Sequence, residues 1–183
     1  MLKYYSNLIS TLGKSYIYGM VLQNNKIYAL VKNEEVINLI KLLKTNSITK
    51  ATGLIDIFAI DTNNTKRFSL TYTLWNYEAS IRYLIRVHLS QWTPINSISN
   101  IFASANWLER EVWDMYGIKI INHPDLRRIL TDYGFQGHPL RKDFPLMGYL
   151  EIRYEDSLRT IIMEPIELSQ QYRYFKYENK WQK

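Results

Sequence analysis

Hydrophobic and polar residues along the first 89 positions repeat with helical and strand periods in turn. Over residues 2–12, apolar side chains recur three and four positions apart, which predicts one buried face of a short helix that ends at Gly13. Two runs rich in β-branched and aromatic residues follow in 14–31, and they flank Asn24-Asn25. Because asparagine tolerates the positive φ of tight turns, this part of the sequence predicts a β-hairpin.

Residues 34–44 return to the helical period. Asn33 stands at the position of an N-cap, glutamates occupy the first turn and lysines the last, as the helix dipole favours. The apolar stripe of this predicted helix consists of Val36, Leu39, Ile40 and Leu43.

Three strand patterns complete this part of the chain, at residues 53–61, 67–75 and 81–89. The links between them are short, which favours antiparallel neighbours in one sheet. The fold class that results is α+β, a two-layer domain of order α-β-β-α-β-β-β with a mixed or antiparallel sheet and its helices on one face. We expect this docking domain to occupy residues 1–89.

Residues 90–104 interrupt the pattern and form a connector, in which a short helix is predicted over 97–103. Asn106 and Glu109 then stand three positions apart, which is the spacing of a capping box at the start of a longer helix. Gly117 ends this helix, since glycine commonly follows the last helical residue.

Beyond Gly117 the sequence is irregular and rich in aromatic and basic residues. One helical turn is predicted at 125–130, and a β-hairpin is predicted with strands 150–154 and 159–163. The remaining tail lacks a regular period and suits a segment that lies on another surface. We therefore interpret residues 105–183 as a helix followed by a long extended C-terminal arm that wraps a partner.

The composition excludes several kinds of site. The 183 residues include no cysteine, so disulfides, thiolate nucleophiles and cysteine-bound zinc or iron–sulfur centres are excluded. No run of about 18 apolar residues that would span a membrane is present. The N-terminal residues resemble neither a secretory signal nor an arginine-rich transit peptide, so we expect a chain that is made where it works or is given in its mature form.

The formal net charge of +6 leaves two interpretations of the surface open. One is an ordinary basic surface or one matched to acidic neighbours, and the other is nucleic-acid binding. The sequence holds no RNA-binding signature, zinc knuckle or dense basic run, which favours the first. A basic RNA-binding module stays the alternative from another functional class, and salt-sensitive binding of nucleic acid would favour it.

Acidic residues on the helix after residue 105 are the first candidates for chemistry. Glu109, Arg110, Glu111 and Asp114 are the charged residues of this helix. Acid–base or metal-binding roles are conceivable, but the spacing of zinc motifs such as HExxH or ExxH is absent. We interpret these residues as structural ion pairs, among them Arg110 with Asp114 four positions apart, and as contacts with a partner.

Two histidines, His123 and His138, each precede a proline. A metal ligand is one interpretation of such a residue. More commonly the imidazole hydrogen-bonds a loop backbone while the proline fixes an extended conformation, and we expect that role here.

The basic residues of the arm are the remaining candidates. They include Arg127, Arg128, Arg141 and Lys142. No glycine-rich loop opens a helix beside them, so a nucleotide site is not expected, and no G-x-S-x-G nucleophile elbow is present. The acids that alternate with them are Asp125, Asp132 and Asp143. We expect the arginines to pair with carboxylates, within the loop or on a partner.

The stretch from Trp107 to Tyr149 closely resembles the signature of one protein family. The residues at the signature's spacing are Glu109-Arg110-Glu111, Asp114, Met115-Tyr116, His123 and Arg127. The sequence continues as PDLRRILTDYGFQGHPLRKDFPLMGYLEIRYE and then EPIEL, in the family's order. The family is the 30 kDa core subunit of respiratory complex I, called NADH dehydrogenase subunit 9, which has counterparts in bacteria. The resemblance is specific over 105–173, looser but colinear over 52–104, and only a matter of pattern before that.

The resemblance implies the same α+β fold and a place in the peripheral arm of NADH:ubiquinone oxidoreductase. Members of the family pack against the large quinone-pocket subunit and the small iron–sulfur subunits. It therefore implies a cofactor-free scaffold subunit in a hetero-oligomer, without nucleic acid and with no active site of its own. NADH, FMN, the iron–sulfur clusters and ubiquinone would be held by partner subunits.

The resemblance also implies a location. The family lies on the matrix side of the mitochondrial inner membrane, or on the cytoplasmic face in bacteria, and is attached to the membrane only through the complex. The form GFQGHPLRKDFP is similar to that of mitochondrially encoded members. A related membrane-bound hydrogenase or dehydrogenase complex stays an alternative, which the identity of the electron-input subunit would distinguish.

The expected partner interface is formed by the signature residues and the aromatic side chains among them. They are Glu109, Arg110, Glu111, Trp113, Asp114, His123, Asp125, Arg127, Arg128, Tyr133, Phe135, His138, Arg141, Lys142, Asp143 and Phe144. Aromatic side chains, Trp107 included, would be buried against a neighbour while arginines pair with its carboxylates. No catalytic, cofactor-binding or metal-binding residue is expected in this chain.

Overall fold

The computed structural model describes residues 7, 9, 14–24, 26–62 and 65–175. The chain forms two compact units, Met1–Phe144 and Pro145–Lys183. The helix predicted over 2–12 and the end of the predicted tail lie outside the described residues, apart from isolated positions.

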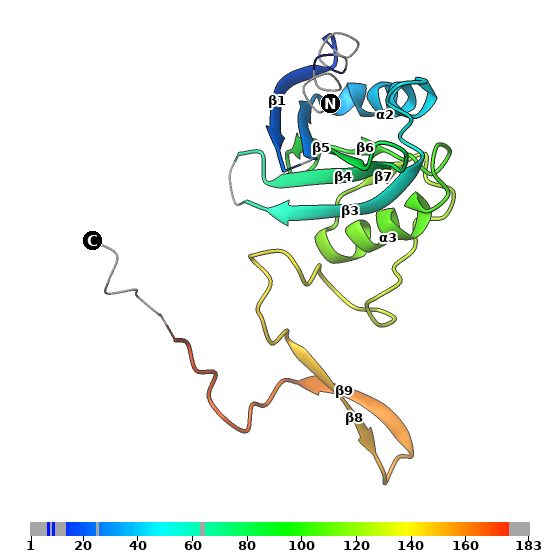
Figure 1. The fold of residues 1–183 in the computed structure, drawn as a ribbon. Coiled ribbons are helices and arrows are strands. Elements are labelled where there is room, and N and C mark those ends of the chain that lie inside the picture. Colours follow the sequence, from blue (N-terminus) through cyan, green and yellow to red (C-terminus); the bar gives the residue numbers. More distant parts are fainter. Residues whose placement is uncertain (1–6, 8, 10–13, 25, 63–64, 176–183) are drawn as a thin grey trace, which may run out of the picture. The chain divides into compact units, whose positions relative to one another are not determined.

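Five strands of the first unit form one mixed sheet, drawn in Figure 1. They are β1 (Ile17–Gln23), β2 (Lys26–Val31), β3 (Gly53–Asp61), β4 (Phe68–Asn76) and β5 (Ile81–Leu89). The spatial order is β1-β2-β5-β4-β3, in which β2 and β5 run parallel and all other neighbours run antiparallel. The predicted α+β class and mixed sheet are confirmed, and the strand patterns locate β3, β4 and β5 within one residue.

The helix predicted after the hairpin is present as η1 (Asn33–Glu35) followed by α2 (Val36–Thr45). Its predicted apolar stripe is fully buried. Asn33 is not the N-cap, because the cap position is Glu35 and the Asn33 side chain donates to the carbonyl of Pro94 at 2.9 Å. The asparagine thus ties the start of the helix to the connector.

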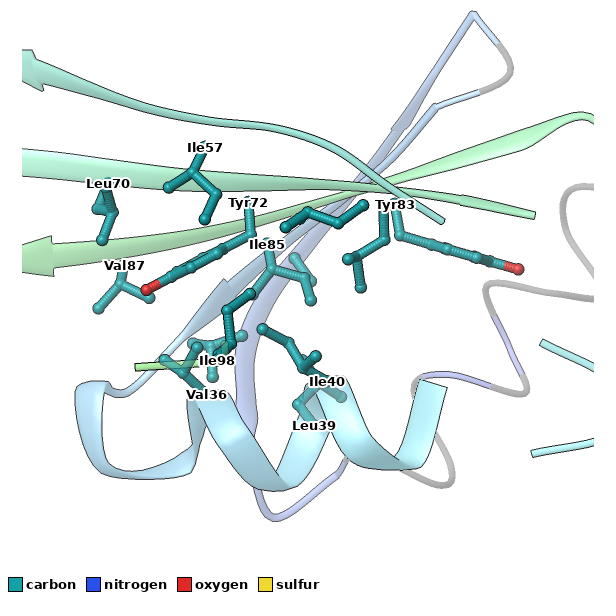
Figure 2. Packing of buried hydrophobic residues seen from close by; sticks show 14 of the residues in the cluster. Val36, Leu39, Ile40, Ile57, Leu70, Tyr72, Tyr83, Ile85, Val87 and Ile98 are labelled. Atoms are coloured by element: carbon teal, nitrogen blue, oxygen red, sulfur yellow. The ribbon is translucent and has the colours of Figure 1, made fainter. Parts of the chain in front are cut away.

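Alternate side chains of the sheet form the core with α2. Figure 2 shows Ile57, Tyr72 and Ile85 pointing from neighbouring strands toward the helix. Two buried polar groups, the Tyr83 hydroxyl and the Asn76 amide, both donate to the carbonyl of Thr49, at 3.0 and 2.7 Å. The segment that follows α2 is thereby fixed on the same face of the sheet as the helix.

The connector is irregular where a short helix was predicted over 97–103. It contributes the strand β6 (Ile95–Asn96), which pairs in parallel with β7 (Ile120–Ile121). The amides of Ile101 and Phe102 both donate to the carbonyl of Ile98, so the segment makes a tight turn. The Ser97 hydroxyl and the Ile98 amide at the start of this segment donate to the buried carboxylate of Glu109, and the segment does not continue beyond one turn.

The longer helix is α3 (Ala105–Tyr116), with Ser104 at the cap position and Gly117 after its last residue. The predicted capping box is wrong, because Asn106 lies inside the helix and the Glu109 side chain is buried and bound elsewhere. No helical turn forms at 125–130 either, since amides that a helix would use internally point to Asp114.

The core extends well beyond residue 89, where the sequence placed the end of the docking domain. Buried side chains of the connector, of α3 and of β7 join the same hydrophobic cluster as the sheet. They include Ile95, Ile98, Phe102, Ala105, Val112, Ile118 and Ile120. The first compact unit therefore takes in the connector, α3 and the residues up to Phe144.

The second unit contains the predicted hairpin, formed by β8 (Leu150–Glu155) and β9 (Thr160–Pro165). Both strands extend slightly past the predicted bounds. Arg159 closes the turn with a positive φ of 51°. The amide of Ile166 donates to the carbonyl of Tyr149 at 3.1 Å, which continues the pairing past β9.

The central strand makes a direct stability test possible. Ile85 on β5 is completely buried, whereas Ile60 on β3 is about half exposed. Replacement Ile85→Ala should lower the free energy of unfolding by about 2–5 kcal/mol, because the cavity cannot refill fully. Ile60→Ala should cost about 0.5 kcal/mol or less. Urea unfolding of both variants measures the difference, and equal losses would contradict this account of the core.

Candidate functional site

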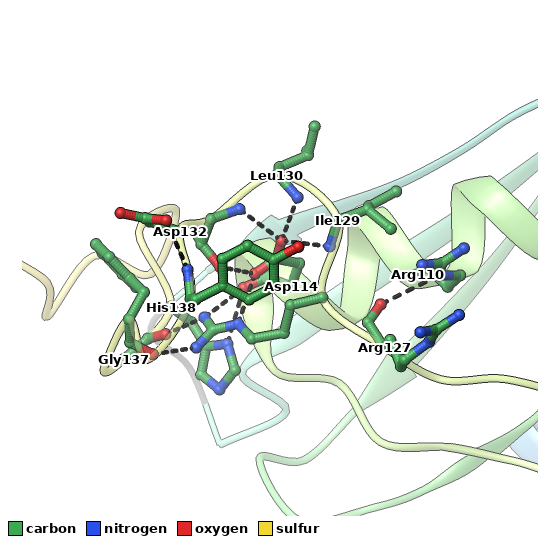
Figure 3. A network of polar contacts seen from close by, with 12 residues as sticks. Arg110, Asp114, Arg127, Ile129, Leu130, Asp132, Gly137 and His138 are labelled. Carbon is green, nitrogen blue, oxygen red and sulfur yellow. Dashed lines mark hydrogen bonds and ion pairs between the residues drawn. The ribbon is translucent and has the colours of Figure 1, made fainter.

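Residues 122–144, called the signature loop here, fold against helix α3 through polar contacts. The contacts converge on the C-terminal half of the helix, as Figure 3 shows. Most of the signature residues identified from the sequence lie in this helix and loop.

Asp114 lies in the last turn of α3, and its side chain is fully buried. Its Oδ2 accepts hydrogen bonds from the backbone amides of Ile129, Leu130 and Thr131, at 3.1, 2.7 and 3.0 Å. Its Oδ1 accepts from Thr131 Oγ1 and from Arg128 Nε, both at 2.7 Å. One carboxylate therefore fixes three consecutive loop residues against the helix, where the sequence had suggested an ion pair with Arg110.

The charge of Asp114 is maintained by these donors. Burial alone would raise its pKa, but the hydrogen bonds from Thr131, Arg128 and two backbone amides outweigh burial and hold the pKa well below its ordinary value. A group whose pKa is depressed in the folded state adds stability at neutral pH and loses it as the pH falls. Attachment of the loop thus depends on an ionised carboxylate.

Arg128 continues the network into the loop. Its Nη1 donates to the carbonyl of Phe135 at 2.5 Å, and its Nη2 donates to the carbonyls of Gly137 and Asp114. Its guanidinium also lies over the Phe135 ring, 5.5 Å from the centroid. The donors of Arg128 are therefore directed at groups of its own chain.

The C-terminal end of α3 is closed by two loop side chains. His138 Nδ1 donates to the Asp114 carbonyl at 2.9 Å, and Arg141 Nε donates to the Tyr116 carbonyl at 2.6 Å. Gly117 has a φ of 71°, and its amide donates a hydrogen bond to the carbonyl of Trp113. A Cβ at this glycine would overlap His138 and Arg141, so the close fit requires glycine.

His138 is suited to this neutral donor role. Burial lowers its pKa, and the nearby charges of Arg141 and Arg128 lower it further against the opposing hydrogen bond to Asp114. Its ring also meets the Trp113 ring edge-on, with centroids 5.8 Å apart. The expectation that this histidine binds backbone is confirmed, although the backbone belongs to the helix.

Glu109 ties the N-terminal half of α3 to the connector. Its carboxylate accepts from Ser97 Oγ at 2.6 Å and from the Ile98 amide at 2.8 Å. Burial raises its pKa, and these two donors and His123 only partly oppose that effect. His123 Nε2 lies 3.7 Å from the carboxylate and 3.2 Å from the Asn106 carbonyl.

The hydrogen bonds of His123 define its tautomer. Its Nδ1 accepts from the Asp125 amide at 3.1 Å, so the proton lies on Nε2, which faces the Asn106 carbonyl. His123 therefore binds the loop backbone at Asp125, as expected, and also the helix backbone at Asn106.

A third buried carboxylate, that of Asp61 at the end of β3, lies outside the signature and holds the far end of the loop. Arg67 Nη2 lies 2.9 Å from Asp61 and 2.9 Å from Asp143, and it bridges the two. The Lys142 amide also donates to Asp61, at 3.0 Å. The Arg141 guanidinium lies over the Phe68 ring beside this group. Asp61 and Arg67 were not among the predicted site residues, and their signal in the sequence is the placement of opposite charges at the end of one predicted strand and the start of the next.

The other predicted residues divide into internal and exposed groups. Phe135 and Phe144 pack together with centroids 5.8 Å apart. Arg127 pairs with Asp125 at the surface, and Arg110 donates to the Arg127 carbonyl. Exposed residues include Trp107, Glu111, Leu130, Asp132, Tyr133, Leu140 and Lys142. Tyr133 is 96% exposed, which leaves a large aromatic ring free for an external contact.

The hydrogen bonds of Asp114, Arg128, His138 and Arg141 hold the signature loop against α3 at many points. Among the described residues, no group of three or more potential metal-binding side chains occurs. Within that same part of the chain, no helix combines the length and the apolar character needed to cross a bilayer. Buried carboxylates are each matched by donors, which is the arrangement expected of a structural network.

The role of Asp114 leads to a prediction about pH. The wild type should lose stability as the pH falls toward and below 3.8, the ordinary aspartate pKa. Asp114→Asn should be less stable at neutral pH by about 3–5 kcal/mol and lack this part of the acid loss. Urea unfolding across this pH range tests it, with Glu111→Gln as an exposed control from the same helix. An Asn variant with the wild-type acid profile would contradict the assignment.

The Gly117 fit is tested with a matched glycine. Gly117 and Gly134 have φ values of 71° and 74°, but a Cβ at Gly134 would meet no atom within 4 Å. Gly134→Ala should cost about 1–2 kcal/mol through backbone strain alone. Gly117→Ala should cost more and should raise amide hydrogen exchange across the signature loop, because His138 and Arg141 must move. Equal costs and unchanged exchange would show that the close fit is unimportant.

Comparison with known proteins places this helix and loop in a family. The family model described as "Respiratory-chain NADH dehydrogenase, 30 Kd subunit" matches residues 29–150. NADH-ubiquinone oxidoreductase subunit 9 of Acanthamoeba castellanii is 46% identical over 98% of this chain and 93% of its own length. The protein of the same name from Reclinomonas americana is 40% identical over 91% of this chain and 82% of its own length.

A plant relative agrees with this grouping, and a solved structure shares the fold. NADH dehydrogenase [ubiquinone] iron-sulfur protein 3 of Arabidopsis thaliana is 48% identical over 79% of this chain and 76% of its own length. A chain of the membrane-bound sulfane sulfur reductase, an archaeal respiratory membrane complex, shares the fold with a TM-score of 0.65 at 19% identity, covering 78% of this chain and 86% of that one. The chain described here therefore belongs to the family of the 30 kDa subunit of respiratory-chain NADH dehydrogenase.

Proposed function

We propose that this chain is a cofactor-free core subunit of the peripheral arm of NADH:ubiquinone oxidoreductase, the proton-translocating complex I. The observation that carries the proposal is the family membership, supported by relatives that match nearly the whole chain. In this role the chain takes part in the enzyme reaction by holding other subunits in place, and it has no active site of its own.

The absence of cysteine supports a subunit that holds no iron–sulfur cluster itself. Plant relatives carry the name iron-sulfur protein 3, yet the present sequence contains no cysteine. Iron–sulfur clusters are held mainly by cysteine thiolates. We therefore assign the clusters, FMN, NADH and ubiquinone to partner subunits.

The β8–β9 hairpin supplies a surface for docking. Its cross-strand register pairs Ile152 with Met163 and Tyr154 with Ile161, so these four side chains share one face. All four are more than half exposed. On the other face, Arg153 pairs with Glu155 and Glu164 at 2.7 and 2.8 Å.

An apolar hairpin face of this kind needs a partner. A two-stranded sheet is marginally stable in water, and packing against another element gives it independent stability. On the polar face Arg153 already pairs with two glutamates, whereas the apolar side chains of the other face are the ones that gain from burial. We assign this face to the large quinone-pocket subunit, the partner that the family resemblance implies for the arm.

The signature loop gives a second, rigid contact. The Asp114 network holds the loop backbone while Tyr133, Leu130 and Leu140 remain exposed. Preorganised side chains lose less conformational entropy on binding, so a loop fixed in advance binds more tightly. The small iron–sulfur subunits are the partners proposed for this surface.

The same proposal gives a location. The relatives are subunits of a respiratory enzyme, and no described helix is suited to cross a membrane. We place the chain on the matrix side of the mitochondrial inner membrane, attached only through the complex. If a different electron-input subunit were to co-purify with the chain, a related membrane-bound complex would replace complex I in this account.

The hairpin face is tested with two lysine substitutions. Ile152→Lys puts a charge on the apolar face, whereas Thr160→Lys adds the same charge on the polar face opposite Glu155. Ile152→Lys should reduce incorporation into the complex by about tenfold or more, because a buried unpaired charge costs several kcal/mol. Thr160→Lys should assemble normally.

Native gels and NADH:quinone activity of the membranes measure this effect. Thermal unfolding of each full-length variant serves as the folding control. Normal assembly of both variants would show that the hairpin face is not a docking surface.

A further inference from the structure

The face of the five-stranded sheet opposite α2, called the outer face here, carries its own pattern of charge. Alternate residues on each strand belong to it, beginning with Lys26 on β2, Arg82 on β5 and Trp75 on β4. These three side chains are direct cross-strand neighbours in the register of the sheet. Like charges on directly opposed positions destabilise a sheet. An anion bound beside Lys26 and Arg82 would therefore relieve the repulsion between these two cations.

The same three residues surround a surface hollow. Asn24 and Ser80 complete its lining, and its volume is about 220 Å³. This space is larger than one water molecule of about 30 Å³ and accommodates a carboxylate side chain. Within the described part of the chain, neither Lys26 nor Arg82 forms an ion pair.

Unsatisfied polar groups continue along the outer face. Ser69 Oγ, Thr71 Oγ1 and Arg86 Nε are buried and have no hydrogen-bond partner among the described residues. Ser69 and Thr71 are 3% and 0% exposed. Thr71 is the direct neighbour of Arg86 across the β4–β5 pair. These atoms are shielded by neighbouring side chains of their own sheet, so they lie beneath the outer face and do not contact a partner directly.

Apolar side chains separate these polar groups. Leu84, Tyr28 and Leu30 lie on the outer face and are partly or largely buried, whereas Val21 beside Tyr28 is 61% exposed. The outer face carries three cationic side chains, Lys26, Arg82 and Arg86. It also carries one acid, Asp56, which lies across from Thr73. Its chemical complement is therefore both acidic and apolar.

This combination favours a polypeptide over a nucleic acid. Nucleic acids bind through exposed cations that follow the phosphates and through open aromatic stacking surfaces. Here Arg86 is half buried, Leu84 lies between it and Arg82, and Tyr28 and Val21 extend the row of Leu84 across the neighbouring strands. A peptide segment supplies backbone donors, backbone acceptors, carboxylates and apolar side chains together.

We propose that the outer face docks an acidic, amphipathic segment of a partner protein. One carboxylate of that segment enters the hollow between Lys26, Arg82 and Trp75. Its apolar side chains cover Val21 and Tyr28, which are neighbours across the β1–β2 pair. This interface is separate from the hairpin and the signature loop, and it goes beyond the scaffold role assigned to them.

Site-directed photo-crosslinking tests the proposal in the native assembly. A photoreactive phenylalanine analogue at Val21 projects beside Tyr28, and mass spectrometry identifies the residues that it captures. We expect a peptide in which Asp or Glu residues alternate with apolar residues. The double variant Lys26→Glu/Arg82→Glu should reduce this crosslink by about tenfold or more, because it turns attraction into repulsion.

Matched controls separate docking from folding. Lys32→Glu/Lys41→Glu makes the same change of charge at exposed positions of the helix side and should leave the crosslink unchanged. Lys26→Gln/Arg82→Gln removes charge without reversing it and serves if the glutamate variant is unstable in thermal unfolding. Lysine placed at the captured acids should restore crosslinking to the glutamate variant.

Several outcomes would overturn the proposal. One is capture of a nucleic acid, a lipid, a second copy of this chain or a peptide segment without acidic residues. Another is a crosslink whose yield does not change in the Lys26→Glu/Arg82→Glu variant. Absence of any crosslink from Val21, while the same probe at Tyr133 captures a partner, would overturn it as well. That last result would leave the proposed docking of the arm intact.

Discussion

A buried carboxylate must be surrounded by donors, and the arrangement around Asp114 follows from that requirement. An ionised group removed from water is tolerated only when its lone pairs are used. Five donors from residues 128–131 meet this need. The backbone of the loop has little freedom left, because three successive amides must point at one carboxylate. The position of Arg128 then determines where the carbonyls of Phe135 and Gly137 lie.

Two acids on the same helix show how hydrogen-bond donors determine the direction in which the pKa of a buried carboxyl group shifts. Glu109 receives two close hydrogen bonds, and burial prevails, so its pKa is raised. Asp114 receives five, and its pKa is lowered. As the pH rises, the Glu109 contribution to stability decreases, whereas the Asp114 contribution increases. Both anchor α3, one to the connector before it and one to the loop after it, which suits a part that has to keep its shape.

The sheet and the second helix could be predicted because their signals are local. Strand alternation and helical spacing place Ile57, Tyr72 and Leu39 on the buried face without knowledge of their neighbours. The hairpin at 150–165 was predictable for the same reason. The family could be identified because the signature retains its spacing even where the backbone is irregular.

The long-range contacts could not be predicted in this way. Glu109 fits a capping box by spacing, but its true donors come from a connector that precedes the helix. Arg110 is four residues from Asp114, yet Arg128, on the loop, is the cation that reaches it. Asp61 binds the Lys142 amide across 81 positions of sequence, and no local pattern reports such a contact. In each case tertiary hydrogen bonding overrode a plausible local pairing.

The parallel pairing of β2 with β5 has a consequence for how the protein is made. The central strand β5 joins a partner that left the ribosome much earlier, after the whole of α2, β3 and β4 has intervened. The core is closed only when Ile118 and Ile120 arrive and the loop reaches Asp61. Contacts of such high sequence separation fold slowly and leave apolar strands uncovered in the meantime. During synthesis, β1 and β2 therefore cannot complete the sheet until β5 has emerged.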